Sequence, residues 1–238
     1  MKVSLSIIIT ALDEEQNLES NVKKVVSSVA PVIEDFEIII INDGSHDKTR
    51  AIADRLARQD RRISAYHNAK NMGIGYSYKR GVSLAKKRYV VWMAADDAAD
   101  YPSFRRTLTF TGQADLIIPY ITNKELRSKF RNFVSNMYVD TLNLLFGLDI
   151  NYYTSYVIIR KYLVRDLTGI SNGFTYMPEI VVILVRRGCS YKQVPLKQGQ
   201  RPFGKSKMFR PKNIALNFFS IAKLIYRIYF IEARHNKN

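Results

Sequence analysis

Apolar runs alternate with amphipathic stretches through the first half of the chain. Four continuous apolar runs, which are typical of buried strands, are separated by stretches whose apolar residues recur at helical spacing. These runs are Val3–Ile9, Phe36–Ile41, Ile63–Tyr66 and Tyr89–Met93. Because each run is apolar on both strand faces and is followed by a helical pattern, we predict an α/β fold with a mostly parallel sheet flanked by helices.

The pattern changes after a fifth apolar run, Leu116–Ile118. The elements expected from there on are a long helix, a β-like stretch, a second helix and a strand, at Lys124–Phe146, Tyr152–Ile159, Pro178–Arg187 and Tyr191–Pro195. Gly147 is well suited to end the long helix. No internal repeat or low-complexity segment interrupts this order, so the second half is expected to complete the same sheet.

The last apolar segment, Ile214–Ile231, carries its few polar residues on one helical stripe that includes Lys223 and Arg227. This pattern predicts a C-terminal amphipathic helix. A transmembrane span is disfavoured because the segment is barely long enough and contains two cations. A helix lying on a membrane surface or packing on a neighbouring subunit is favoured, and a core-packed last helix remains an alternative.

Composition limits the partners. A formal charge of +16 on 238 residues requires an acidic partner, which could be nucleic acid, an anionic membrane surface or a phosphorylated small molecule. The single cysteine, Cys189, provides neither a disulfide framework nor a thiolate metal site and fits a reducing cytoplasm. Since the first apolar run is too short for a signal peptide, we expect a protein that acts at the cytoplasmic side.

Carboxylates follow three of the predicted strands. Asp13 and Glu14 follow the first, Asp43 follows the second, and Asp96 and Asp97 follow the fourth. In a parallel sheet these positions meet at one edge, where ligands of open α/β folds bind. Acidic side chains there suit a divalent cation carrying a phosphate-rich ligand. The alternative is that Asp96 and Asp97 only cap the next helix and that the Asp43 turn is an ordinary one.

Several segments, in order, resemble motifs of the family 2 glycosyltransferases, particularly the dolichol-phosphate mannose synthase-like branch. The first four lie at Ser6–Glu15, Ile41–Thr49, Asn71–Gly73 and Ala95–Pro102. The last of them resembles Asp-Ala-Asp-Leu-Ser-x-x-Pro, with Ala95 at the first aspartate and Asp97 at the second. Further matches are the Arg-x-x-x-Ser, Phe-x-x-x-x-Glu and Arg-x-x-Gly-x-Ser-Lys patterns, at Arg131 and Ser135, Phe174 and Glu179, and Arg201, Gly204, Ser206 and Lys207.

This resemblance implies a GT-A-type (Rossmann-like) fold and an inverting transfer from a nucleotide sugar with Mg²⁺ or Mn²⁺. It places the donor in residues 1–118 and the acceptor in residues 119–209 of one domain, residues 1–209, with the amphipathic helix in residues 210–238. Asp97 is the expected metal ligand. Because Ala95 lacks a carboxylate, either metal affinity is reduced or Asp100 substitutes as a second ligand. The residues expected to bind the donor are Thr10, Ala11, Asp13, Glu14, Asp43, Gly73, Asp96 and Lys207.

The acceptor is expected to contact Arg127, Arg131, Ser135 and Arg201, and the reaction centre to include Asp97, Glu179 and Arg201. A polyprenyl phosphate needs no strong base, so Glu179 would only orient it. A saccharide hydroxyl would need Glu179 as general base. Helix-terminal carboxylates are the alternative interpretation of Glu14 and Glu179.

Two other interpretations remain. A basic nucleic-acid-binding protein would need cations interleaved with stacking aromatics, whereas the carboxylates at the sheet edge would repel nucleic acid. An inactive relative is suggested by Ala95. The favoured partners are therefore a nucleotide sugar, a polyprenyl phosphate or saccharide acceptor and a membrane surface, without nucleic acid. A second copy of the chain is a further candidate partner.

Overall fold

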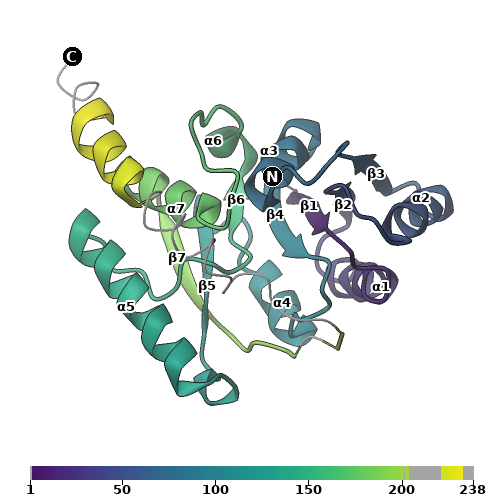
Figure 1. Ribbon diagram of the computed structural model, residues 1–238, viewed down its shortest axis with the longest axis horizontal. Coiled ribbons are helices and arrows are strands. Elements are labelled where there is room, and N and C mark those ends of the chain that lie inside the picture. Colours follow the sequence, from purple (N-terminus) through teal and green to yellow (C-terminus); the bar gives the residue numbers. More distant parts are fainter. Residues whose placement is uncertain (1, 201, 204–220, 233–238) are drawn as a thin grey trace.

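The computed structural model describes residues 2–200, 202–203 and 221–232. Its centre is a seven-stranded sheet with the order β3-β2-β1-β4-β6-β5-β7 (Figure 1). The strands are β1 Ser4–Ala11, β2 Asp35–Asn42, β3 Ile63–His67, β4 Tyr89–Ala94, β5 Leu116–Ile121, β6 Ile158–Arg160 and β7 Tyr191–Leu196. Of these, β6 runs antiparallel to both its neighbours. The predicted, mostly parallel α/β fold is thus confirmed, and the first four strands lie within two residues of their expected bounds.

Helices cover both faces of the sheet. They are α1 Leu18–Val29, α2 Thr49–Gln59, α3 Ile74–Leu84, α4 Tyr101–Leu108, α5 Lys129–Phe146, α6 Lys161–Arg165 and α7 Tyr176–Arg186. One core cluster joins the sheet to α1, α2 and α4. The other joins it to α3, α5, α6, α7 and the helix of residues 221–232. The continuous apolar strands are therefore buried on both sides, as their composition predicts.

Strand register determines where the loops emerge. In the parallel pairs, Ala11 of β1 lies beside Asn42 of β2, and Thr10 lies beside Ala94 of β4. The loops that follow β1, β2 and β4 consequently leave the sheet at the same edge. This is the edge at which the sequence predicts a ligand site.

The long helix was predicted to begin at Lys124, and this start is wrong, because α5 begins at Lys129. Lys124–Leu126 form a single 3₁₀ turn, and Arg127 is extended. Ser128 then begins α5, because its side chain accepts a hydrogen bond from the backbone nitrogen of Arg131 at 3.2 Å. A second N-cap inside an apparently continuous helical pattern therefore separates Arg127 from the helix that carries Arg131.

The β-like stretch Tyr152–Ile159 is a strand only at its end. Residues 152–157 form a loop, and β6 begins at Ile158. The Ser155 hydroxyl donates to the carbonyl of Pro119 at 2.7 Å, which fixes the loop against β5 without extending the ladder. This correction matters because the loop contributes to the candidate site.

The helix of residues 221–232 packs on the second core through buried Leu224 and Ile228. Tyr226, Tyr229 and Phe230 are exposed on it. This described part of the expected amphipathic helix thus has both a core-packed face and an exposed aromatic face. Within the described residues, no helix has the length and apolar content that crossing a membrane requires.

Candidate active site

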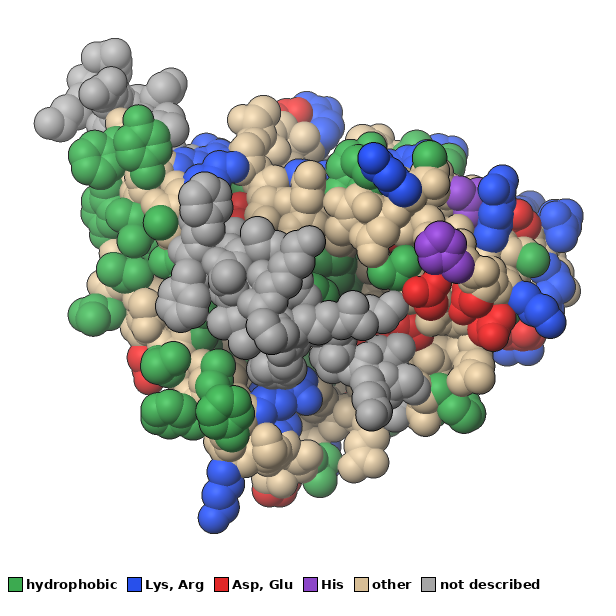
Figure 2. Space-filling model, in the orientation of Figure 1, with side chains coloured by type: hydrophobic (Ala, Val, Ile, Leu, Met, Phe, Trp, Pro, Cys, Tyr) green, Lys and Arg blue, Asp and Glu red, His purple; other side chains and the backbone are tan. Residues whose placement is uncertain are grey.

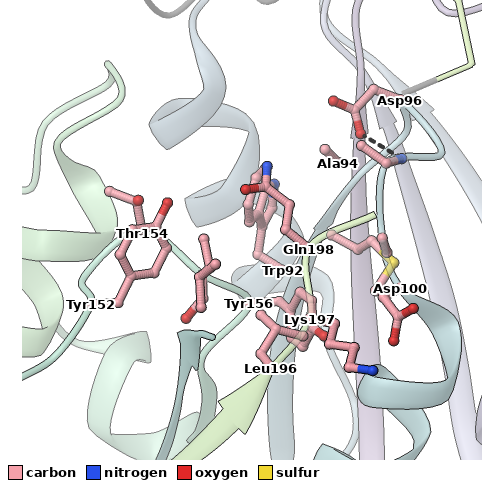
Figure 3. A pocket seen from close by; sticks show the side chains of 15 residues that line it. Trp92, Ala94, Asp96, Asp100, Tyr152, Thr154, Tyr156, Leu196, Lys197 and Gln198 are labelled. Carbon is pink, nitrogen blue, oxygen red and sulfur yellow. Dashed lines mark hydrogen bonds between the residues drawn. The ribbon is translucent and has the colours of Figure 1, made fainter. Parts of the chain in front are cut away.

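A cavity of about 150 Å³ opens at the ligand edge of the sheet. Its walls come from the end of β4, the β4–α4 loop, residues 152–156 and the segment that follows β7. Figure 3 shows Asp96 and Asp100 on one side of it and Tyr152 and Thr154 on the other. Lys197 adds a cation to this mixture of acidic, hydroxyl and aromatic groups. Such a lining suits a polar, charged ligand.

The indole of Trp92 forms part of the cavity wall and is held from two sides. Its Nε1 donates to the hydroxyl of Thr10 at 2.9 Å. Its ring meets that of Tyr176 edge to face, with centroids 6.1 Å apart. Thr10, expected at the donor, thus positions a side chain of the cavity, and its neighbour Ala11 is buried in the sheet.

The loops after β1 and β2 are bonded to each other. Asp13 has a left-handed backbone (φ 55°), its carboxylate accepts from the backbone nitrogen of His46 at 3.0 Å, and its own nitrogen donates to Ser45 Oγ at 2.9 Å. The nitrogen of Glu14 donates to Thr49 Oγ1 at 2.8 Å. The structure therefore brings the first two predicted motifs together as one surface.

Asp43 is buried and organises the loop before α3. Its Oδ1 accepts from the nitrogen of Met72 at 3.0 Å and from Asn68 Nδ2 at 2.6 Å, and its Oδ2 accepts from the nitrogen of Gly73 at 3.0 Å. Gly73 has φ 95°, and a Cβ there would come within 2.4 Å of the carbonyl oxygen of Asn172. The geometry thus gives Asp43 a clear role in shaping the loop, while direct contact with the donor stays a prediction.

Asp97 faces away from the cavity. Its carboxylate accepts from the Tyr101 hydroxyl at 2.6 Å, from Ser20 Oγ at 2.8 Å and from Lys24 Nζ at 2.6 Å. The side chain is 2% exposed, and its φ of 56° is left-handed. Both oxygens are thus engaged by α1 and α4. Its assignment as metal ligand stays a prediction that this arrangement does not favour.

Asp96, and not Asp97, lines the cavity. Its Oδ1 accepts from the nitrogen of Ala98 at 3.3 Å within the same turn (Figure 3). Asp100 also lines the cavity, although its Oδ2 accepts from the nitrogen of Ser103 at 2.9 Å and caps α4. Capping, proposed as the alternative for Asp96 and Asp97, is thus performed by Asp100.

The described carboxylates at the cavity are too few to hold a metal ion by themselves, so a metal there would also need oxygen atoms from a bound substrate. Among the described residues, no three histidine, cysteine, aspartate or glutamate side chains are placed to hold a metal ion. Mg²⁺ in phosphate-binding sites, however, is typically held by one or two carboxylates together with substrate phosphates and water. Asp96 and Asp100 are carboxylates that line the cavity, and a role for either as metal ligand stays a prediction.

Glu179 is buried in the first turn of α7 and does not contribute to the cavity lining. Its Oε1 accepts from the Thr175 hydroxyl at 2.8 Å and its Oε2 from the nitrogen of Ser171 at 2.9 Å. Burial raises its pKa, and the hydrogen bonds oppose that shift in part. Its carboxylate closes the loop that packs against the start of α3, where the nitrogen of Gly75 donates to the carbonyl of Asn172 at 2.8 Å.

Arg127 and Arg131 form a cationic pair next to the cavity. Arg127 Nη2 lies 3.4 Å from the Tyr152 hydroxyl, and its guanidinium carbon lies 5.8 Å from that ring's centroid. Arg127 Nε is buried and has no hydrogen-bond partner within the described part of the chain. The pKa of Arg131 is lowered mainly by burial and further by the nearby positive charge of Arg127. Ser135 follows one turn later and is half-buried.

Arg201 and Lys207, with Gly204 and Ser206 of the same motif, lie outside the described residues. The segment before them runs beside the β4–α4 loop, because Gln198 and Ala99 form an antiparallel bridge. The sequence did not single out Trp92, Tyr152, Lys197 or Gln198 as cavity residues. Trp92 is hidden inside an apolar run, and the others lie in segments whose path depends on the assembled sheet.

Comparisons with known proteins identify the family. The model of "Glycosyl transferase family 2" matches residues 6–174. The chain belongs to this family. It is 28% identical over 230 residues to polyprenol monophosphomannose synthase of Mycolicibacterium smegmatis, which covers 91% of this chain and 85% of that protein. It is 33% identical over 100 residues to glycosyltransferase AglD of Haloferax volcanii, covering 41% of this chain.

The extent of these matches differs. The matched segments span 16% of AglD and 34% of an uncharacterized Haemophilus influenzae glycosyltransferase. Among solved structures, glucosyl-3-phosphoglycerate synthase of Mycobacterium tuberculosis in complex with UDP is similar, with a TM-score of 0.66 and 18% identity over 95% of this chain and 80% of that one. The same enzyme has been solved with Mn²⁺, UDP-glucose and phosphoglyceric acid, with a TM-score of 0.66 and 17% identity. These structures confirm the predicted GT-A-like fold.

Proposed function

We propose that this chain is an inverting glycosyltransferase that moves a hexose from a UDP- or GDP-sugar onto a polyprenyl phosphate, dolichyl or undecaprenyl. Its similarity to polyprenol monophosphomannose synthase extends over nearly the whole chain. The observation that carries the proposal is the half-buried pair of Arg127 and Arg131 beside the cavity. Two guanidinium groups of like charge next to the cavity suit a phosphate, which arginine binds with paired hydrogen bonds.

Residues 1–118 are proposed to hold the donor. The joined loops after β1 and β2 would contact the nucleoside, with Asp13 and Glu14 at their centre. Asp43 would hold the Gly73 loop close to the ligand, where the absence of a side chain permits backbone approach. Lys207 is proposed to grip the diphosphate.

The cofactor is proposed to be Mn²⁺ or Mg²⁺. Solved relatives in fold bind Mn²⁺ together with a UDP-sugar. When bound, the metal would take up negative charge that develops on the leaving nucleoside diphosphate. We assign Asp96 as its main protein ligand, with Asp100 beside it, because these two carboxylates line the cavity whereas Asp97 is held by Lys24.

Residues 119–209 are proposed to hold the acceptor, with Arg127, Arg131, Ser135 and Arg201 contacting its phosphate. A saccharide hydroxyl, as in polysaccharide or lipid-linked oligosaccharide synthesis, is the alternative acceptor. That alternative needs a general base, and Glu179 has both oxygens engaged within its own loop. The geometry of Glu179 therefore favours the phosphate acceptor, whose oxygen is already anionic.

A polyprenyl phosphate resides in a membrane, so we propose that the chain acts as a peripheral protein at the cytoplasmic membrane face. Residues 210–238 are proposed to contribute to membrane association or to contact a second copy. Nucleic acid is not a proposed partner, because Asp96 and Asp100 at the cavity would repel it.

Calorimetric titration with UDP, GDP and dTDP tests the donor half of this proposal. One nucleoside diphosphate is expected to bind at least about tenfold more tightly with Mn²⁺ or Mg²⁺ than with EDTA, because a bound cation would offset the repulsion between the diphosphate and the carboxylates of the cavity. Failure of every nucleotide to bind would instead support an inactive relative. Salt-sensitive RNA or DNA binding without nucleotide binding would support the nucleic-acid interpretation.

A further inference from the structure

The α5 region exposes a row of large apolar side chains. The exposed fractions are 57% for Leu126, 73% for Phe130, 66% for Phe133 and 49% for Met137. We call these four residues the α5 apolar stripe. Figure 2 shows hydrophobic side chains gathered along the edge of the molecule where Figure 1 places α5. Exposed apolar side chains grouped in this way mark an interaction surface.

Helical spacing places the stripe on a single face. With 3.6 residues per turn, Phe130, Phe133 and Met137 fall within an arc of about 60°. The core is contacted by a different face of α5, which buries Leu142 and Phe146. Packing within the described part of the chain therefore leaves the stripe in solvent.

The surroundings of the stripe are basic. Between residues 124 and 140 the basic side chains are Lys124, Arg127, Lys129 and Arg131, and the acidic ones are Glu125 and Asp140. Lys124 and Lys129 are exposed. An apolar face with flanking lysine and arginine is characteristic of helices that lie in the headgroup region of an anionic bilayer.

We propose that α5 docks on an anionic lipid bilayer, with the α5 apolar stripe inserted among the lipids. A second copy of the chain is the competing occupant. It would bring two chains of formal charge +16 together, whereas a bilayer containing anionic lipid supplies the opposite charge. The bilayer is therefore the occupant that the charge of the chain favours.

The exposed aromatics of the 221–232 helix extend this surface. The Tyr229 hydroxyl donates to the carbonyl oxygen of Leu145, and the Tyr229 ring stacks on that of Phe146 with centroids 6.2 Å apart. Tyr226 and Phe230 are 60% and 57% exposed beside it. The C-terminal end of α5 thus continues into a second surface with exposed aromatic rings, and tyrosine is enriched at membrane interfaces.

Docking would also place the acceptor groups near the lipid. Arg131 lies on α5 between Phe130 and Phe133, and Arg127 lies immediately before the helix. A lipid-borne phosphate could then reach the cationic pair while its hydrocarbon chain stays in the bilayer. This consequence rests on the proposed polyprenyl phosphate acceptor, whereas docking itself requires only an anionic bilayer.

Vesicle flotation of the full chain tests the docking. The unaltered protein is expected to float with vesicles of phosphatidylcholine and phosphatidylglycerol, and far less with phosphatidylcholine alone. The double variant Phe130→Ser, Phe133→Ser is expected to lower the partition coefficient at least about tenfold, because two rings leave the bilayer. Tyr162→Ser, which removes a 60% exposed aromatic from α6, is the matched control and should bind as the unaltered chain does.

Unchanged flotation of the double variant would overturn the proposal, provided that its thermal unfolding matches that of the parent. The parent chain could instead fail to bind vesicles and form a dimer that the double variant does not form. That result would overturn the proposal and assign the α5 apolar stripe to contact with a second copy. Sugar transfer to a water-soluble, short-chain prenyl phosphate separates the two proposals. The double variant should retain transfer to this soluble acceptor. If the parent chain itself shows no such transfer, that result counts against the proposed function and not against membrane docking.

Discussion

Replacement of Asp96 by asparagine is expected to reduce sugar transfer at least about 100-fold, because the variant would hold less firmly the cation that offsets negative charge on the leaving diphosphate. Asp96 lines the cavity, and its bond to the nitrogen of Ala98 can also be made by an asparagine oxygen. Thermal unfolding should therefore stay close to that of the parent. The measurements are kcat/KM for transfer and the gain in nucleoside diphosphate affinity on adding Mn²⁺.

Asp97→Asn is the matched control at the neighbouring position. Loss of the charge that faces Lys24, Ser20 and Tyr101 is expected to lower the free energy of unfolding by about 1–3 kcal/mol. The metal-dependent gain in nucleotide affinity should persist in this variant at a temperature where it is folded. If Asp97→Asn abolishes that gain and Asp96→Asn preserves it, the assignment from motif alignment holds and ours is wrong.

Arg127→Ala is expected to raise the KM for polyprenyl phosphate at least about tenfold and to leave nucleoside diphosphate affinity unchanged, because the proposed charge-assisted hydrogen bond to phosphate is lost. Arg127→Lys should recover only part of the effect, since an ammonium group cannot reproduce the planar contacts of guanidinium with phosphate and with the Tyr152 ring. Steady-state kinetics with each substrate varied in turn provides both constants.

Arg165→Ala on α6 is the control for removing one positive charge, because Arg165 is exposed and pairs with adjacent Asp166. It should change neither constant. An equal loss of nucleotide affinity in Arg127→Ala would show that the cationic pair grips the donor diphosphate and would remove the main support for a lipid phosphate acceptor.

The sheet and its ligand edge could be predicted because they depend on local patterns. Strands such as Ile7–Ile9 and Ile38–Ile40 are apolar on both faces, and parallel pairing then forces their carboxyl ends to one edge. The family could be recognised from the order of short motifs. Both results need only the type and sequence order of the residues.

The orientation of the acidic turn could not be predicted. Asp96 and Asp97 are chemically identical, and the side-chain alternation that distinguishes neighbours ends with β4 at Ala94. The left-handed backbone at Asp97 and the three donors from α1 and α4 decide which carboxylate faces the cavity. The two donors from α1, Ser20 and Lys24, lie about 75 positions before Asp97, and nothing local in the sequence shows these contacts.

Two of the predicted acceptor residues, Arg127 and Arg131, were selected from a helical arrangement that the structure does not have. Arg127 and Arg131 were expected to be one turn apart on a single helix, whereas Ser128 starts α5 between them. Their charges nevertheless interact, and Tyr152 from the loop before β6 contacts Arg127. Tyr152 could not be recognised beforehand, because its stretch has the composition of a strand.

Mass spectrometry of the lipid products tests the central claim most directly. The chain is incubated with UDP- and GDP-hexoses and with polyprenyl phosphate, polyprenol of the same length or a saccharide, and Glu179→Gln is run in parallel. We predict a hexose added to polyprenyl phosphate alone, with the rate of Glu179→Gln within about tenfold of the parent. A product on the saccharide but not on the lipid phosphate, lost by orders of magnitude in Glu179→Gln, would contradict the account.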